Sequence, residues 1–396
     1  MTESPPPIFI HSLFRSGSTY LFDVFRQSPA KYWCYQEPEN EMLLHLTDMA
    51  DSIADTARVN AALRHPQLDR PYFAEFMPIR EEVARLFSRH FPYDSFFLTE
   101  TDAEPDLRRY LELLIMRAQG RPVFQFCRST GRIGWLRRNF TARHLFLWRH
   151  PWDQWWSYKV TSYFDVANLL ILNSDAIPPV FEEIRSVLNF RPYHDTTLEK
   201  EYNYFDSHGL TVADSYLLFF ALWYYTMYEG LRSSDVIISI DELSNSEEYR
   251  KYTLGRLEEC GINGVDFSGC QIYQGYFCDK DADFFNPIEE KVIRLFMAHG
   301  YSEETAHQIA ELRSNLSRPK EPAWESEILR LRQMLKEYRD EAVGMKYTIW
   351  SQSREIERLS RREDELMSIY NSRSWKLLLP FLNIYWNLRA RIRRHN

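Results

Sequence analysis

Short apolar runs alternate with helical patterns along most of this chain, and this alternation constrains the fold more than any other feature. Each run is too short for a helix and ends in a turn signal, which is typical of a buried strand. Strands that alternate with helices indicate a parallel α/β sheet. The expected strands are residues 8–13, 95–99, 123–127, 144–148 and 236–240. The main expected helices are 18–27, 105–119, 152–164 and 214–231.

Composition narrows the class of protein. The chain has 396 residues, of which 44% are hydrophobic, so it can bury one large core or two ordinary ones. Its net charge of -8 does not favour a nucleic-acid binder. Five cysteines without a CxxC pair indicate reduced thiols in a reducing compartment. Since no apolar run approaches the ~20 residues of a membrane span, we expect a cytoplasmic protein.

The sequence predicts four segments. Residues 1–7 form a disordered polar leader, and 8–317 form the α/β domain, within which 168–207 is an expected insertion over the sheet face. Residues 323–371 carry apolar side chains at alternating spacings of three and four from Ile328 to Tyr370, which predicts a coiled coil and self-association. The alternative is one long helix folded back on its own domain.

The last segment, residues 372–396, contains no acidic residue. An apolar, aromatic patch precedes four arginines, a combination that suits an anionic membrane surface. The alternative is a terminal helix docked on its own protein, with its arginines in solvent.

A first candidate anion site follows the first expected strand. In parallel sheets, ligands bind beyond the carboxyl ends of the strands. The turn there supplies an arginine fork, hydroxyl groups and the amides of a helix N-terminus, all of which suit phosphate. Its residues are Arg15, Ser16, Gly17, Ser18 and Thr19. No lysine follows Gly17, so the turn does not match the pattern for a nucleoside triphosphate with magnesium.

A second candidate anion site follows the strand expected at 144–148. Arg149 lies at the strand end, Pro151 suits the start of a helix, and Ser157 lies two turns later. Two such strand ends in one sheet suggest a ligand with two separated phosphate groups. The alternative is that Arg149 pairs with Asp153 and that Ser157 is merely exposed.

These two motifs resemble those of a known family. Arg15-Ser-Gly-Ser-Thr looks like the 5′-phosphosulfate loop of PAPS-dependent sulfotransferases of the carbohydrate type, and Arg149-x₇-Ser157 is similar to their 3′-phosphate motif. The resemblance covers roughly residues 7–165. It implies a P-loop-like parallel α/β fold, PAPS as donor, PAP as product and no metal. Two departures are His150, where the family has an acidic or amide residue, and the lack of a recognisable third nucleotide segment in 240–320.

The resemblance also implies a general base. Glu37 matches a catalytic glutamate of related bacterial sulfotransferases, and the following Pro38 predicts an extended backbone at Glu37. Aromatic neighbours (Tyr32, Trp33 and Tyr35) are expected to raise the pKa of Glu37 by desolvation. Arg15 would stabilise the leaving phosphate. Glu37 could instead be a structural carboxylate, while Glu39 and Glu41 are expected to be solvated carboxylates at a helix start.

Five arginines after residue 127 complete the expected site. Arg128 is the candidate to enter the cleft and bind substrate, and Arg132, Arg137, Arg138 and Arg143 could form a basic rim that attracts a polyanion.

The resemblance implies sulfation of a glycan, either a cell-surface polysaccharide or a glycolipid precursor. Residues 372–375 (SRSW) resemble the ends of bacterial enzymes that act on such glycans at the inner membrane face, so a peripheral location is expected. Two alternatives are a P-loop kinase or NTPase, with Asp241 as its metal-binding aspartate, and a non-catalytic coiled-coil assembly protein.

Overall fold

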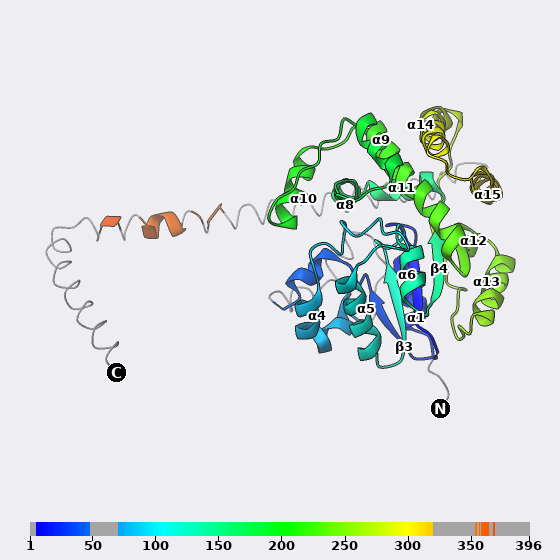
Figure 1. The fold of residues 1–396 in the computed structure, drawn as a ribbon, viewed down its shortest axis with the longest axis horizontal. Helices are drawn as coiled ribbons and strands as arrows, with labels where there is room; N and C mark the ends of the chain where they lie inside the picture. Colours follow the sequence, from blue (N-terminus) through cyan, green and yellow to red (C-terminus); the bar gives the residue numbers. More distant parts are fainter. Residues whose placement is uncertain are drawn as a thin grey trace. The chain divides into compact units, whose positions relative to one another are not determined.

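The computed structural model describes residues 5–47 and 70–319, together with helical residues 353–354, 356, 358–363 and 367–368 (Figure 1). The chain divides into two compact units, Met1–Lys320 and Glu321–Asn396. Apart from those helical residues, the coiled coil expected at 323–371 lies outside the described residues. The tail expected at 372–396 and residues 1–4 of the leader lie outside them as well.

A parallel five-stranded sheet forms the centre of the first unit, with the strand order β2-β3-β1-β4-β5. Helices flank it, which confirms the α/β class (Figure 1). The strands are β1 (Ile8–Ser12), β2 (Tyr32–Gln36), β3 (Arg121–Phe126), β4 (Arg143–Trp148) and β5 (Val236–Ser239).

The sequence placed one strand wrongly. Residues 95–99 form a turn and bends and not a strand, and the buried rings of Phe96 and Phe97 belong to the same core cluster as residues of the helices α8 (Tyr163–Leu172), α9 (Pro179–Val187) and α11 (Val212–Ser233). Backbone hydrogen bonds from Ser95 to His90 and from Phe96 to Tyr93 close these turns. The edge position belongs to β2, which pairs with β3 from Tyr32 to Gln36.

Both faces of the sheet are covered. On β1, Ile8 and Ile10 pack toward α1 (Ser18–Arg26) and α13 (Glu247–Glu259), while Phe9 packs toward α5 (Pro105–Arg117) and α6 (Ile133–Asn139). Successive side chains of a strand point to opposite faces of the sheet, and helices cover both faces here. Apolar residues are therefore required at nearly every position of these strands. The remaining short elements near this sheet are η1 (Glu41–His45), η2 (Ala74–Ile79), α4 (Arg80–Leu86) and α12 (Ile240–Asn245).

A helical layer forms a second large core. It contains α7 (Pro151–Tyr158), α8 (Tyr163–Leu172), α9 (Pro179–Val187), α10 (Leu198–Ser207), α11 (Val212–Ser233), α14 (Asp279–Ala298) and α15 (Glu303–Ser314). Helix α11 is buried almost continuously from Ser215 to Met227, as expected for a core helix. The expected insertion at 168–207 is helical, and Figure 1 shows α8, α9, α10 and α11 gathered near one another on one side of the unit. Among the described residues, no helix combines the length and the apolar character needed to cross a membrane.

Candidate functional site

The turn after β1 has the geometry of an anion-binding loop. Arg15 and Gly17 both adopt positive φ angles, of 62° and 89°, and Gly17 precedes the first residue of α1. Within the described chain, no side chain caps this helix at Gly17, and the N-terminus of a helix attracts anions.

Glycine is required at position 17 for two reasons. Its φ of 89° disfavours any side chain, and an added Cβ would lie 2.7 Å from Ile240 Cγ1 of α12. The hydroxyl groups of the turn already have neighbours. Ser16 Oγ donates to the carbonyl of Leu13 at 2.8 Å, and Ser18 Oγ lies 3.5 Å from Cys127 Sγ.

The structure brings the two predicted anion sites together. Arg15 Nε donates to Ser157 Oγ at 2.9 Å, although 142 residues separate them. Arg149 lies beside them, since its Nη1 donates to the carbonyl of Arg15 at 3.4 Å. The three side chains predicted to hold phosphate therefore converge at the carboxyl ends of β1 and β4.

The expected alternative for Arg149 does not occur. Asp153 accepts instead from Arg318, at 3.0 Å, and from the amide of Gly275, at 2.7 Å. Arg149 Nη2 donates to the carbonyl of Tyr273 at 2.5 Å, while its buried Nε has no hydrogen-bond partner among the described residues.

Residues 273–275 are part of this site, and sequence reasoning missed them. They belong to an irregular segment without helical or strand periodicity, so no pattern pointed to them. Tyr273 and Gly275 provide a carbonyl and an amide to Arg149 and Asp153, and the ring of Tyr273 remains 43% exposed. The only available signal was an aromatic and glycine-containing stretch outside any regular element.

Glu37 lies directly after β2 in an unusual backbone conformation. Its φ is 42°, so the extended backbone predicted from Pro38 is wrong. The amide of Glu37 donates to the carbonyl of Gln125 at 2.8 Å, which holds the residue beside the end of β3. The tight turn to Asn40, whose amide donates to the carbonyl of Glu37 at 2.9 Å, accounts for the change of direction.

The Glu37 carboxylate is buried and receives three donors. Tyr72 Oη donates to Oε1 at 2.5 Å, while Asn40 Nδ2 and Arg128 Nη1 donate to Oε2 at 2.9 and 2.6 Å. Burial raises the pKa of Glu37, but the charge of Arg128 and these hydrogen bonds outweigh burial, so its pKa is lowered overall. The expectation that aromatic desolvation raises this pKa is therefore wrong. Glu37 is an ionised carboxylate at neutral pH.

Arg128 links two carboxylates. Its side chain is 1% exposed, and its Nη2 reaches both Glu41 Oε2 and the hydroxyl of Tyr163 at 2.6 Å. Its guanidinium also lies 4.9 Å from the ring centroid of Phe14. Since Arg128 pairs with both Glu37 and Glu41, its role in this structure is to hold the two carboxylates in place.

The predicted basic rim is wrong for Arg132, whereas Arg137 and Arg138 lie at the surface. Arg132 is fully buried and pairs with Glu39 at 2.5 Å, and Arg137 pairs with Asp235 at 2.9 Å. Glu39 is only 2% exposed, so the expectation of a solvated carboxylate is also wrong for that residue. The reason is that residues 128–132 turn back into the domain after β3, where they meet the carboxylates that follow β2.

Arg15 and Glu37, the two residues predicted to be catalytic, both have a strained backbone. Within the described ranges, four non-glycine residues have positive φ, and they are Arg15, Lys31, Glu37 and Asn189. Such conformations cost of order 1–3 kcal/mol each and tend to cluster at functional sites. Two of the four are the residues that the sequence predicts to be catalytic.

Asp241 occupies a structural position. It is fully buried, accepts the amide of His150 at 2.7 Å through Oδ2 and accepts Gln274 Nε2 at 3.1 Å through Oδ1. His150 in turn accepts the amide of Trp152 and so caps α7. These bonds connect the end of β4 to α12 and to residues 273–275. His150 thus has a structural role as the N-cap of α7, at the position where the sulfotransferase motif has an acidic or amide residue.

The fold and the candidate site define an α/β protein with two arginines, Arg15 and Arg149, together at the carboxyl edge of a parallel sheet. No family model, curated protein or solved structure matches the chain.

Proposed function

We propose that the protein is a sulfotransferase, which moves a sulfuryl group from PAPS to a hydroxyl group of a glycan. The observation that carries this proposal is the convergence of Arg15, Arg149 and Ser157, with Arg15 Nε 2.9 Å from Ser157 Oγ. Phosphate motifs at the ends of two paired strands suit a ligand that carries two phosphate groups.

The residues present fit such a nucleotide. The buried Nε of Arg149 lacks a hydrogen-bond partner within the described part of the chain, and a ligand that supplied one would remove the cost of burying this donor. The turn from Arg15 to Thr19 would act as a P-loop-like cradle for the 5′ end, and Arg149 with Ser157 would hold the 3′-phosphate. When bound, PAPS supplies the sulfuryl group and a phosphate leaving group.

The chain's own residues would then perform two tasks. Glu37, ionised at neutral pH, would take the proton of the acceptor hydroxyl as its oxygen attacks sulfur. Arg15 would stabilise the negative charge that develops on the leaving phosphate oxygen. Cys127 follows β3 and lies between the proposed base and the cradle. Its Sγ is 3.5 Å from Ser18 Oγ in the cradle, and burial together with the charge of Glu37 raises the pKa of its thiol. The proposed base and the cradle therefore both lie near the end of β3.

The kinase or NTPase alternative has less support. The turn has no lysine after Gly17, and both Asp241 oxygens already accept hydrogen bonds from His150 and Gln274.

Calorimetry with PAP, with and without magnesium, tests the proposal directly. We expect saturable binding of one PAP per chain with the same affinity in both buffers. Absence of PAP binding, or binding that requires magnesium, would contradict the sulfotransferase proposal. ATP with magnesium serves as the comparison ligand, since a kinase or NTPase would prefer it.

A further inference from the structure

The charge network around Glu37 ends at the surface in a carboxylate. The side chain of Arg128 is 1% exposed, that of Glu37 is 10% exposed and that of Glu41 is 21% exposed. Glu41 is thus the charged group of this network that an arriving molecule meets first. Two carboxylates and one arginine leave the network with a net charge of −1.

Two tyrosines accompany Glu41. Tyr163 Oη donates to Glu41 Oε1 at 2.7 Å and accepts from Arg128. The ring of Tyr202, on α10, lies 6.3 Å from that of Tyr163, and burial followed by the charges of Asp206 and Glu41 raises the pKa of Tyr202. Tyrosine rings combine a flat apolar face with a polar tip, and the face of a sugar ring has the complementary pattern of C–H and hydroxyl groups.

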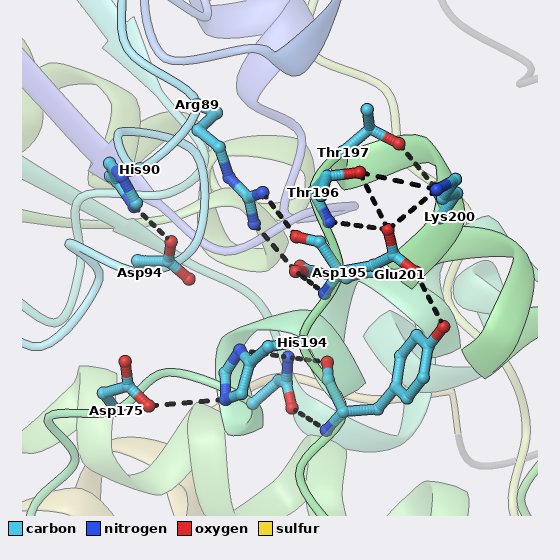
Figure 2. Close-up of polar contacts among 12 residues, drawn as sticks. Arg89, His90, Asp94, Asp175, His194, Asp195, Thr196, Thr197, Lys200 and Glu201 are labelled. Carbon is cyan, nitrogen blue, oxygen red and sulfur yellow. Dashed lines mark hydrogen bonds and ion pairs between the residues drawn. The ribbon is translucent and has the colours of Figure 1, made fainter.

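The helix that carries Tyr202 is firmly anchored. Arg89 Nη2 donates to Glu201 Oε1 at 2.8 Å, and Arg89 Nη1 donates to the carbonyl of Asp195 at 2.9 Å (Figure 2). Glu201 also accepts the amide of Asp195 at 2.9 Å, and Thr197 caps α10. Because Glu201 is 2% exposed and directly precedes Tyr202, its pair with the partly exposed Arg89 holds the Tyr202 ring beside that of Tyr163 before any ligand arrives.

Three cations of the described chain near Glu41 are already paired with carboxylates. Arg128 pairs with Glu37 and Glu41, Arg132 pairs with Glu39, and Lys159 pairs with Asp165 at 2.8 Å. Among the residues that the structure describes, an acceptor with a carboxylate or sulfate at this position would therefore face Glu41 and Asp206, while these three cations are engaged by carboxylates. Such like-charge contacts select strongly against a ligand.

We propose that Glu41, Tyr163 and Tyr202 form the acceptor subsite and select an uncharged saccharide over uronate-bearing or sulfated ones. Glu41 accepts hydrogen bonds from sugar hydroxyl groups, and the two rings hold the apolar face of the sugar. This inference rests on the proposed sulfotransferase function and adds the charge class of its acceptor.

The test uses the full-length protein saturated with PAP on an array of neutral, uronate-bearing and sulfated oligosaccharides. We expect binding to neutral glycans at least tenfold stronger than to acidic glycans of the same length. Tyr202→Ala should weaken the neutral signal at least tenfold while leaving PAP affinity unchanged, and Glu41→Gln should reduce the discrimination against uronates. Tyr252→Ala, which removes a ring that is 61% exposed on α13, is the matched control and should change neither.

The outcomes separate the two proposals. If PAP binds but the glycan signal is confined to acidic oligosaccharides, or no glycan class binds, the acceptor proposal is wrong and the nucleotide site stands. If neutral glycans bind equally well to the Tyr202→Ala protein, the subsite lies elsewhere. If PAP itself fails to bind in calorimetry, the sulfotransferase proposal fails first.

Discussion

Glu37 has an ionised carboxylate that accepts three hydrogen bonds, and its backbone φ is positive. A lowered pKa makes it a weaker base than a desolvated glutamate, but it keeps the carboxylate ready at neutral pH. The donors also fix its orientation, so the cost in basicity is offset by positioning.

Glu37→Gln tests this role. The amide keeps the shape of the side chain but cannot accept the acceptor proton, so we expect kcat to fall by roughly 10²–10⁴-fold with PAP affinity unchanged. Sulfuryl transfer from labelled PAPS and PAP calorimetry measure the two quantities. Glu81→Gln, at a side chain that is 73% exposed, is the control. Wild-type turnover in the Glu37 variant would move the base to another residue.

Arg149→Ala tests the phosphate site. Removal of a guanidinium that touches the ligand should weaken PAP binding at least about tenfold, or ~1.4 kcal/mol. Calorimetry measures this change, and thermal unfolding checks that the variant is folded. Arg108→Ala, which breaks an exposed pair with Glu112, is the matched control. An affinity within twofold of wild type would show that Arg149 does not hold phosphate.

At the scale of elements, the sequence predicted the sheet class because parallel strands leave a strong apolar signal. It also predicted that the two strand ends followed by arginines belong to one sheet, and Arg15 and Arg149 follow strands that pair with each other. It could not predict the strand at residues 32–36 with the same clarity, because Tyr32 and Trp33 at the edge are only half-buried. The pairing of Arg128 and Arg132 with acidic residues that follow β2 is a tertiary effect, which no local pattern contains.

A buried histidine pair connects β1 to β4 and gives the sheet a pH dependence. His11 Nε2 lies 3.0 Å from His144 Nδ1, and His11 Nδ1 lies 2.7 Å from Ser129 Oγ. Burial lowers the pKa of both histidines, that of His144 to about 4. The unfolded chain, with histidine pKa values near ~6.5, binds more protons below that pH than the folded chain does.

The free energy of unfolding should therefore fall as the pH drops below ~6.5. Each histidine that must stay neutral contributes a loss of about 1.4 kcal/mol per pH unit until its folded pKa is reached. Urea unfolding at pH 7.0 and 5.5 measures the loss. His144→Gln should flatten this dependence, whereas His307→Gln, at an exposed position, should leave it unchanged. An equally steep dependence in His144→Gln would assign the effect to other groups.

At the scale of the whole molecule, the two compact units divide the proposed tasks. The first, Met1–Lys320, contains the sheet and every candidate site residue. In the second, Ile356 and Leu359 are 66% and 52% exposed, and both occupy apolar positions of the heptad pattern. Large apolar side chains that repeat at this spacing are covered in a coiled coil by a partner helix, so we expect a second copy of the chain to cover them.

Ile356→Lys with Leu359→Lys should convert the oligomer to a monomer, because two charges in the apolar seam oppose helix pairing. Ser353→Lys with Ser360→Lys adds the same charges beside the seam and should preserve the oligomer. Light scattering gives the mass of each protein, and PAP calorimetry should give the same affinity for all of them, since the proposed nucleotide site lies entirely in the first unit.

A chain truncated after residue 320 should likewise bind PAP as a monomer and no longer sediment with anionic vesicles. An unchanged mass in the seam variant would favour a single helix that folds back on its own domain, and unchanged sedimentation of the truncated chain would remove the membrane role from residues 372–396.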